Sequence, residues 1–175
     1  MLEIYPYGRN AAVAYAHRWA YRRNPAYFDF SKLGGDCTNF ASQCLYAGSG
    51  VMNFTPVYGW FYRGASDRTA SWTGVKYLYN FLVSNTGAGP FASDTTMDMM
   101  EPGDLVQLAF VGKESYHHTP VIVSIDGTPT LDSIYIAAHS NDSDLRPLSS
   151  YNIAKIRFLH IEGVRNETPP LTEAL

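Results

Sequence analysis

Cysteine is scarce in this sequence, because Cys37 and Cys44 are the only two among 175 residues. On one expected helix their seven-residue spacing separates them by about 10 Å, more than the roughly 7 Å between Cα atoms that a disulfide tolerates. The spacing also matches no zinc-binding motif. We therefore expect two free thiols, and we interpret Cys44 as a small buried apolar residue.

Strong charge and long apolar runs are also missing. The net charge is only −3 and no basic stripe occurs, which argues against a nucleic-acid partner. No run of about 18 apolar residues is present, which excludes a membrane-spanning helix. Residues 1–10 lack the apolar core of a signal peptide. We therefore expect either a cytoplasmic protein or a domain of a longer secreted chain, extracellular or at the cell wall.

Several fingerprints of other enzyme classes are absent as well. The sequence has no G-x-S-x-G elbow, which disfavours a serine hydrolase, and no phosphate-binding loop or G-x-G-x-x-G motif. Asn141, Asp142 and Asp144 carry oxygen ligands, but they lack the calcium-loop pattern with its glycine and closing glutamate. We expect no metal and no cofactor.

The length favours a single domain, which we place at residues 1–165 with a loose tail at residues 166–175. Apolar periodicity predicts helices in the first half and short strands in the second. This order is typical of an α+β fold in which N-terminal helices pack on a C-terminal antiparallel sheet. The expected helices cover residues 10–23, residues 37–47 and a segment from Ser71 or Thr73 to Val83, and the expected strands cover residues 104–110, 119–125, 133–139 and 154–162.

Turn signals separate these elements. Asn24-Pro25 is expected to end the first helix, and Gly48 to cap the end of the second. Residues 49–70 read as a long loop. Pro102-Gly103 suits a type II turn, because proline fixes φ at its first central position and glycine permits positive φ at the second.

The most informative segment is residues 34–40, where two glycines run into a helical pattern that begins at Cys37. Free N–H groups and the helix dipole favour a thiolate at such a position, and a thiolate is a strong nucleophile. Asp36 is a good N-cap, yet its negative charge opposes the thiolate. The segment therefore predicts a nucleophilic cysteine that needs an imidazolium nearby.

Three histidines are candidates for that imidazole. His117 and His118 lead into the apolar run at residues 121–123, and side-chain alternation requires one of the two to face inward. His139 ends an expected strand and begins a polar cluster that includes Asn141. Histidine, asparagine or aspartate can fix the tautomer of a catalytic base. The residues alone leave open which histidine is the base.

Aromatic residues are abundant, with 13 tyrosines and three tryptophans. This is more than a small core usually takes, and aromatic side chains with a polar tip suit a glycan or peptide groove. We expect Trp60, Tyr62 and Tyr116 to line a substrate groove.

Five blocks of sequence resemble the putative amidase domain found mainly in Gram-positive bacteria, and the resemblance runs in order over about residues 5–163. The specific block is Gly35-Asp36-Cys37-Thr38-Asn39-Phe40 and its continuation to Gln43. That domain is similar to the NlpC-type and CHAP-type cell-wall peptidases and amidases, so the resemblance implies their minimal papain-like cysteine-hydrolase fold. The other blocks are residues 10–16, 71–73, 102–107 and 139–149.

The resemblance also implies roles for particular residues. Cys37 matches the nucleophile and His118 the base, with His117 as a rival because the histidine is doubled. The third catalytic position matches His139 or, shortly after it, Asn141. The oxyanion site would combine the N–H of Cys37 with a group near Asp36.

The resulting hypothesis is a monomeric cysteine amidase or peptidase that cleaves an amide or peptide bond in bacterial peptidoglycan. Two alternatives remain open at this point. One is a non-catalytic cell-wall-binding module of the same fold. The other is an acyltransferase or transglutaminase-like enzyme with the same cysteine–histidine dyad, in which an amine replaces water.

Overall fold

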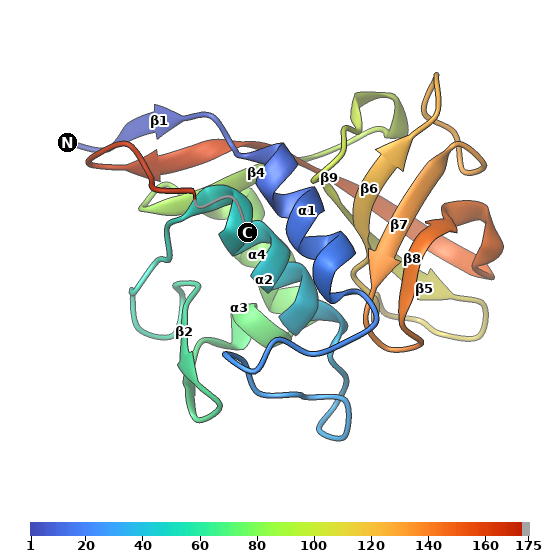
Figure 1. The fold of residues 1–175 in the computed structure, drawn as a ribbon, viewed down its shortest axis with the longest axis horizontal. Coiled ribbons are helices and arrows are strands. Elements are labelled where there is room, and N and C mark those ends of the chain that lie inside the picture. The colour runs from blue at the N-terminus through green and yellow to red at the C-terminus, as the bar shows by residue number, and fades with distance from the viewer. Residues whose placement is uncertain (173–175) are drawn as a thin grey trace.

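One curled antiparallel sheet dominates the structure, and helices from the first half of the chain pack against it (Figure 1). The structure, a computed structural model, describes residues 1–172. The helices in that range are α1 (Arg9–Trp19), α2 (Cys37–Ser49), α3 (Ala70–Thr73) and α4 (Val75–Ser84), with short 3-10 turns η1 (Met97–Met99) and η2 (Leu148–Ser150). The strands are β1 (Glu3–Tyr5), β2 (Tyr62–Gly64), β3 (Asp67–Arg68), β4 (Gly89–Thr95), β5 (Leu105–Phe110), β6 (Val121–Ile125), β7 (Ile134–Ala138), β8 (Ser143–Pro147) and β9 (Ile153–Asn166).

The long strand β9 organises the sheet. It pairs with β1, β4 and β5, and the order continues from β5 through β6 and β7 to β8. Every pairing in this sheet is antiparallel. Strands β2 and β3 form a separate small hairpin. The predicted combination of helices with an antiparallel sheet is confirmed at this level.

Each face of the sheet buries its own apolar cluster. Leu105 and its cross-strand partner Leu159 belong to the cluster that includes the helices, whereas the next pair, Val106 and Phe158, belongs to the cluster on the other face. This alternation follows from the two-residue period of a strand. Helix α2 is buried along almost its whole length, so it occupies the centre of the first cluster.

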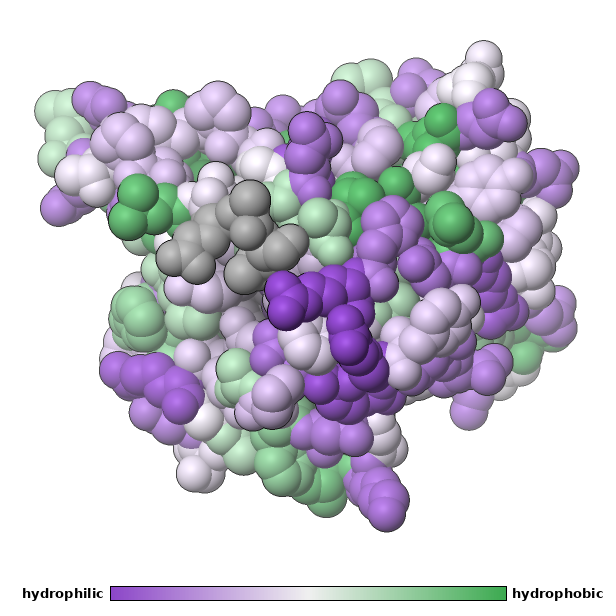
Figure 2. All heavy atoms as spheres, viewed as in Figure 1, coloured by the Kyte–Doolittle hydropathy of each residue, from purple (hydrophilic) through white to green (hydrophobic). Residues whose placement is uncertain are grey.

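The outward side of α1 and of the segment that follows it is polar. Arg18 and Arg22 are exposed, and their guanidinium groups lie 5.2 and 4.9 Å from the ring centre of Trp19. Figure 2 shows strongly hydrophilic surface around the end of α1 and the segment after it. None of the helices in residues 1–172 has the length and apolar content needed to cross a bilayer.

The predicted turn at Pro102-Gly103 fixes the start of β5. Gly103 has a φ of 92°, as the type II turn requires. Asp104 follows it with a fully buried carboxylate that binds Arg9 of α1 at 2.8 Å and His160 of β9 at 2.8 Å. Asp104 therefore ties α1, β5 and β9 together, which is a structural role for a residue within one of the resembling blocks.

Helix ends differ from the predicted ones. Helix α1 stops at Trp19, not at residue 23, and the Trp19 carbonyl contacts His139 instead of continuing the helix. Helix α2 runs to Ser49 and is capped by Gly50, whose φ is 65°. The predicted cap, Gly48, lies inside the helix, where a side chain would collide with Tyr7.

The structure also contains strands that we did not predict. The expected loop at residues 49–70 includes the β2–β3 hairpin, and strands β1, β4 and β8 lie in segments where we predicted no strand. The single expected helix after residue 71 is two helices, since Gly74 between them has an extended backbone with a φ of −113°. Short strands and strands with proline carry little periodic signal.

Strand β9 extends beyond its expected end and includes Asn166, the first residue of the predicted tail. The carbonyl of Leu171 lies close to Gly50 at the end of α2. Residues 173–175 of that tail lie outside the described residues. The single-domain boundary at residue 165 stays a prediction.

Candidate active site

The helix start that carries Cys37 is built by two glycines. Gly34 and Gly35 have φ values of 88° and 105°, which side chains other than glycine rarely adopt. They turn the chain directly into α2, whose first residue is Cys37. The cysteine is 8% exposed. The sequence-based placement of a thiol at a helix start after a glycine turn is confirmed.

Asp36 does not cap the helix as expected. Its fully buried carboxylate accepts hydrogen bonds from the backbone of Phe30 at 2.8 Å and from the Asn39 side chain at 2.9 Å. It also meets Nδ1 of His139 at 2.6 Å and the guanidinium of Arg23 at 3.4 Å. These partners turn the carboxylate into the protein, so it holds the loop before α2 in place.

Burial changes the protonation of Cys37. Its pKa is raised chiefly because burial disfavours the thiolate, and the charge of Asp36 adds to this. The backbone N–H of Thr119 and the hydroxyl of Thr38 act in the opposite direction. The prediction of a lowered pKa is therefore wrong for the resting site, and a base must accept the thiol proton when Cys37 reacts.

His118 supplies a neutral imidazole. It forms a β-bridge with Leu108 beside β6 and is 5% exposed. Burial lowers the pKa of His118 to about 4, with smaller contributions from the charges of His117 and Arg146. Nε2 of His118 lies 3.2 Å from the hydroxyl of Tyr151. The ring is uncharged near neutral pH and can accept a proton.

The expected difference between the adjacent histidines is confirmed, because His117 is only partly buried. Its Nδ1 lies 3.2 Å from the carbonyl of Ser115. The Cys37 sulfur lies 3.8 Å from the carbonyl of His117 and 3.7 Å from the hydroxyl of Thr38. Within residues 1–172 no hydrogen bond joins that sulfur to an imidazole.

One cavity brings most of the predicted catalytic residues together. Its volume is about 720 Å³. Cys37, His117, His118 and Asn141 all line it, whereas His139 does not. Its other lining residues are Gly34, Gly35, Phe110, Ser140, Arg146, Ser150, Tyr151 and Asn152.

His139 belongs to the network behind the cavity. Both ring nitrogens are engaged, Nδ1 by Asp36 at 2.6 Å and Nε2 by the Trp19 carbonyl at 2.8 Å. The ring also stacks on Phe40 with 4.0 Å between ring centres. Among the described residues, no hydrogen bond joins His139 to His118, so no contact supports the orienting role that we predicted for His139.

The aromatic residues expected to bind substrate lie elsewhere. Trp60 is fully buried between Trp72 and Phe81, and the Tyr62 ring packs against Tyr27. Tyr116 lies under the guanidinium of Arg157, at 4.1 Å from its ring centre. None of the three predicted residues lines the cavity with Cys37, and the prediction is wrong for Trp60, which is too deeply buried to line a groove.

Two residues of the site were missed. Arg146 lies on β8 within the resembling block at residues 139–149, but the resemblance implied no role for it. Tyr151 lies in the polar turn that follows, where no periodic or motif signal distinguishes it from surface residues. Only their arrival at the cavity, through the pairing of β8 with β7, identifies them. Across residues 1–172, no group of three or more His, Cys, Asp or Glu side chains is arranged to hold a metal ion.

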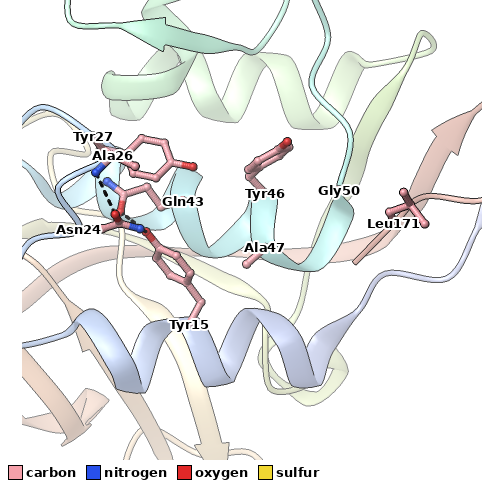
Figure 3. A pocket seen from close by; sticks show the side chains of 9 residues that line it. All are labelled: Tyr15, Asn24, Ala26, Tyr27, Gln43, Tyr46, Ala47, Gly50 and Leu171. Carbon is pink, nitrogen blue, oxygen red and sulfur yellow. Dashed lines mark hydrogen bonds between the residues drawn. The ribbon is translucent and has the colours of Figure 1, made fainter. Parts of the chain in front are cut away.

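A second cavity, of about 360 Å³, lies between α1 and α2 and contains neither cysteine nor histidine (Figure 3). Its polar groups already bind one another. The Tyr15 hydroxyl donates to the Gln43 carbonyl at 2.6 Å, and the Asn24 amide donates to Tyr15 at 3.0 Å. The first cavity is therefore the candidate active site.

Comparison with known proteins gives two matches. The model of a family described as a putative amidase domain matches residues 6–161. The uncharacterized protein YhbB of Bacillus subtilis (strain 168) is 37% identical over 125 residues. That alignment covers 70% of this chain and 39% of YhbB, so the chain spans about two fifths of this relative's length. No solved structure matches the chain.

Proposed function

Because the chain belongs to the putative amidase domain family, we propose that it hydrolyses an amide or peptide bond with Cys37 as the nucleophile. The family description points to amide hydrolysis. One observation supports the dependence on cysteine: Cys37 and His118 line the same cavity of about 720 Å³. A nucleophile and a base that share a cavity can meet the same substrate carbonyl.

The resting pair is neutral, since the pKa of Cys37 is raised and that of His118 is lowered. His118 accepts the thiol proton as the sulfur attacks the carbonyl carbon. The C–N bond then breaks, the leaving amine takes the proton from His118, and a thioester remains on Cys37. Water, deprotonated by His118, hydrolyses the thioester and restores the thiol.

The oxyanion would form at the start of α2. The N–H of Cys37 lies in the first turn, where backbone N–H groups have no partner within the helix. As the group near Asp36 we propose the Ser140 hydroxyl, which accepts a hydrogen bond from the Asp36 N–H at 3.4 Å and belongs to a residue that lines the cavity. Its own proton remains available for a substrate oxygen.

A papain-like relationship and a peptidoglycan substrate are further parts of this proposal. A cysteine that opens a helix, packed on an antiparallel sheet that carries the histidine, supports the first. The resemblance to cell-wall peptidases supports the second. The cavity has the size of a site for a small peptide fragment.

Incubation with purified peptidoglycan tests the proposal. The wild type and Cys44→Ala, which alters a buried cysteine outside the cavity, should release the same fragments, and Cys37→Ala should release none. Identical products from Cys37→Ala would overturn the proposal. Product masses separate hydrolysis, which adds water, from acyl transfer, which adds an amine.

The raised pKa of Cys37 favours one alternative, a wall-binding module without turnover. Such a module would bind sedimented peptidoglycan and release nothing. Cys37→Ala would then bind as tightly as the wild type. Release of fragments by the wild type, with no release by Cys37→Ala, excludes this alternative.

A further inference from the structure

The cavity that contains Cys37 has an unbalanced charge. Arg146 is the only arginine or lysine that lines it, and no aspartate or glutamate does. Arg146 lies on β8, paired with Ile136 of β7, and is partly buried. A permanent cation in a partly buried cavity is costly unless an anion accompanies it.

The protein holds the Arg146 guanidinium without neutralising it. Nε donates to the Ser150 hydroxyl at 2.7 Å, and Nη2 lies 3.4 Å from the Ser150 carbonyl. The guanidinium carbon lies 3.7 Å from the ring centre of Tyr151. These contacts fix the plane of the group, and in the part of the chain that the structure describes no carboxylate forms an ion pair with it.

Carboxylates near this end of the sheet have other partners. Asp142 binds Arg23 at 2.8 Å, and Arg23 also contacts Asp36. Asp144, two residues before Arg146, lies 2.8 Å from His17. Among residues 1–172, Arg146 forms no ion pair, so its charge is left for a molecule that enters the cavity.

We propose that Arg146 binds a free carboxylate of the substrate, so that the enzyme selects amide bonds in acidic peptides, close to a carboxylate. This rests on the proposed function, because it places the carboxylate beside the bond that Cys37 attacks. A guanidinium fixed in one plane matches the two oxygens of a carboxylate. Ser150 and Tyr151 supply that orientation.

The same charge acts on the base. His118 is faced by His117, Arg146, Tyr151 and Cys37, and the positive charge of Arg146 contributes to the low pKa of His118. A carboxylate bound to Arg146 cancels that charge. An acidic substrate would therefore make His118 more basic when it binds, which assists the proton transfer from Cys37.

Two alkylating reagents that react with thiols by the same mechanism test the proposal without a known substrate. Iodoacetate carries a carboxylate and iodoacetamide does not, and both form a C–S bond with Cys37 as iodide leaves and the thiol proton goes to His118 or solvent. The ratio of the iodoacetate rate to the iodoacetamide rate should be about tenfold higher for Cys37 than for free cysteine. Peptide mass spectrometry confirms that the label is on Cys37.

Substitutions of Arg146 test its role, and a substitution of Arg22 is the control. Arg146→Gln should lower that ratio about tenfold, to the value of free cysteine, mainly by slowing iodoacetate, and Arg146→Lys should keep part of the preference. Arg22→Gln, which removes an exposed arginine that also stacks on an aromatic ring, should leave the ratio unchanged. The iodoacetamide rate in each variant shows whether the site is still folded.

The outcomes separate this inference from the proposed function. Reaction with both reagents but the same ratio in wild type and Arg146→Gln overturns the carboxylate site and leaves the nucleophile in place. No reaction of Cys37 with either reagent overturns both. A second experiment uses the peptidoglycan peptides that the wild type cleaves, prepared either with free carboxylates or with those groups converted to carboxamides. Arg146→Gln should raise KM about tenfold for the carboxylate peptides and leave KM for the carboxamide peptides unchanged.

Discussion

Nε2 of His118 lies 3.2 Å from the hydroxyl oxygen of Tyr151. The tyrosine ring is itself fixed, because it stacks on Phe110 with 5.5 Å between ring centres and carries the Arg146 guanidinium on its face. Tyr151 therefore holds one nitrogen of the histidine from a rigid position. A residue that fixes the ring and tautomer of a catalytic base is usually a carboxylate or an amide, and in the mechanism that we propose a phenol takes that place.

We predict that Tyr151→Phe lowers kcat about tenfold, because the variant keeps the ring contacts but loses the hydrogen bond that orients His118. KM should change little. The measurement is steady-state hydrolysis, with Tyr58→Phe as a control at an exposed tyrosine. An unchanged kcat in Tyr151→Phe would show that the hydroxyl does not position the base.

The acidic limb of the activity profile should lie near pH 4. His118 must be neutral to accept the thiol proton, and its pKa is lowered to about 4. A plot of kcat/KM against pH for the wild type measures this in the free enzyme. A limb near pH 6.5 would mean that the histidine is solvated. In Arg146→Gln the limb should move upward, because a positive charge that opposes protonation is removed.

The free energy of unfolding should also depend on pH through His118. Its pKa is lower in the folded protein than the ordinary value of 6.5, so between these values the unfolded chain binds the extra proton. Above pH 6.5 the protein keeps its full free energy of unfolding. As the pH falls from 6.5 to about 4, it loses about 3 kcal/mol of that free energy through His118. Urea unfolding at several pH values measures it. His118→Gln should flatten this part of the profile, and parallel profiles would contradict the assignment.

His139 gives a prediction that separates structure from catalysis. His139→Ala leaves the buried Asp36 carboxylate without one of its partners, and we expect a loss of about 3 kcal/mol in unfolding free energy. His139→Gln, which can still donate to Asp36, should recover part of it. The acidic limb of kcat/KM should stay near its wild-type position in the folded His139→Gln variant. A shifted limb would restore the role in orienting His118 that we first expected.

The sequence predicted the parts of the site that depend on local chemistry. Two glycines and a helical pattern are enough to place Cys37 at a helix start, and strand alternation is enough to bury one of two adjacent histidines. The pKa of Cys37 was predicted in the wrong direction, since burial depends on the rest of the fold. The direction in which Asp36 turns depends on His139, more than a hundred residues away.

The positions of the aromatic residues also could not be predicted from the sequence. Trp60 and Tyr62 were expected in a groove, but they pack with Trp72 and Tyr27 against the first apolar cluster. Composition counts the aromatic side chains and cannot say which of them the long loop folds inward. Arg146 and Tyr151 reach the cavity only because β8 pairs with β7, a contact that sequence periodicity does not describe.

The position of β9 has a consequence for how the protein folds. Three strands that precede β9 in the sequence pair with it, and the pairing of Asn166 with Glu3 joins residues that lie more than 160 positions apart. Loops of this length close slowly, so these pairings form late in folding. Until β9 is in place, the strands that pair with it have open edges, and the protein is then most prone to aggregate.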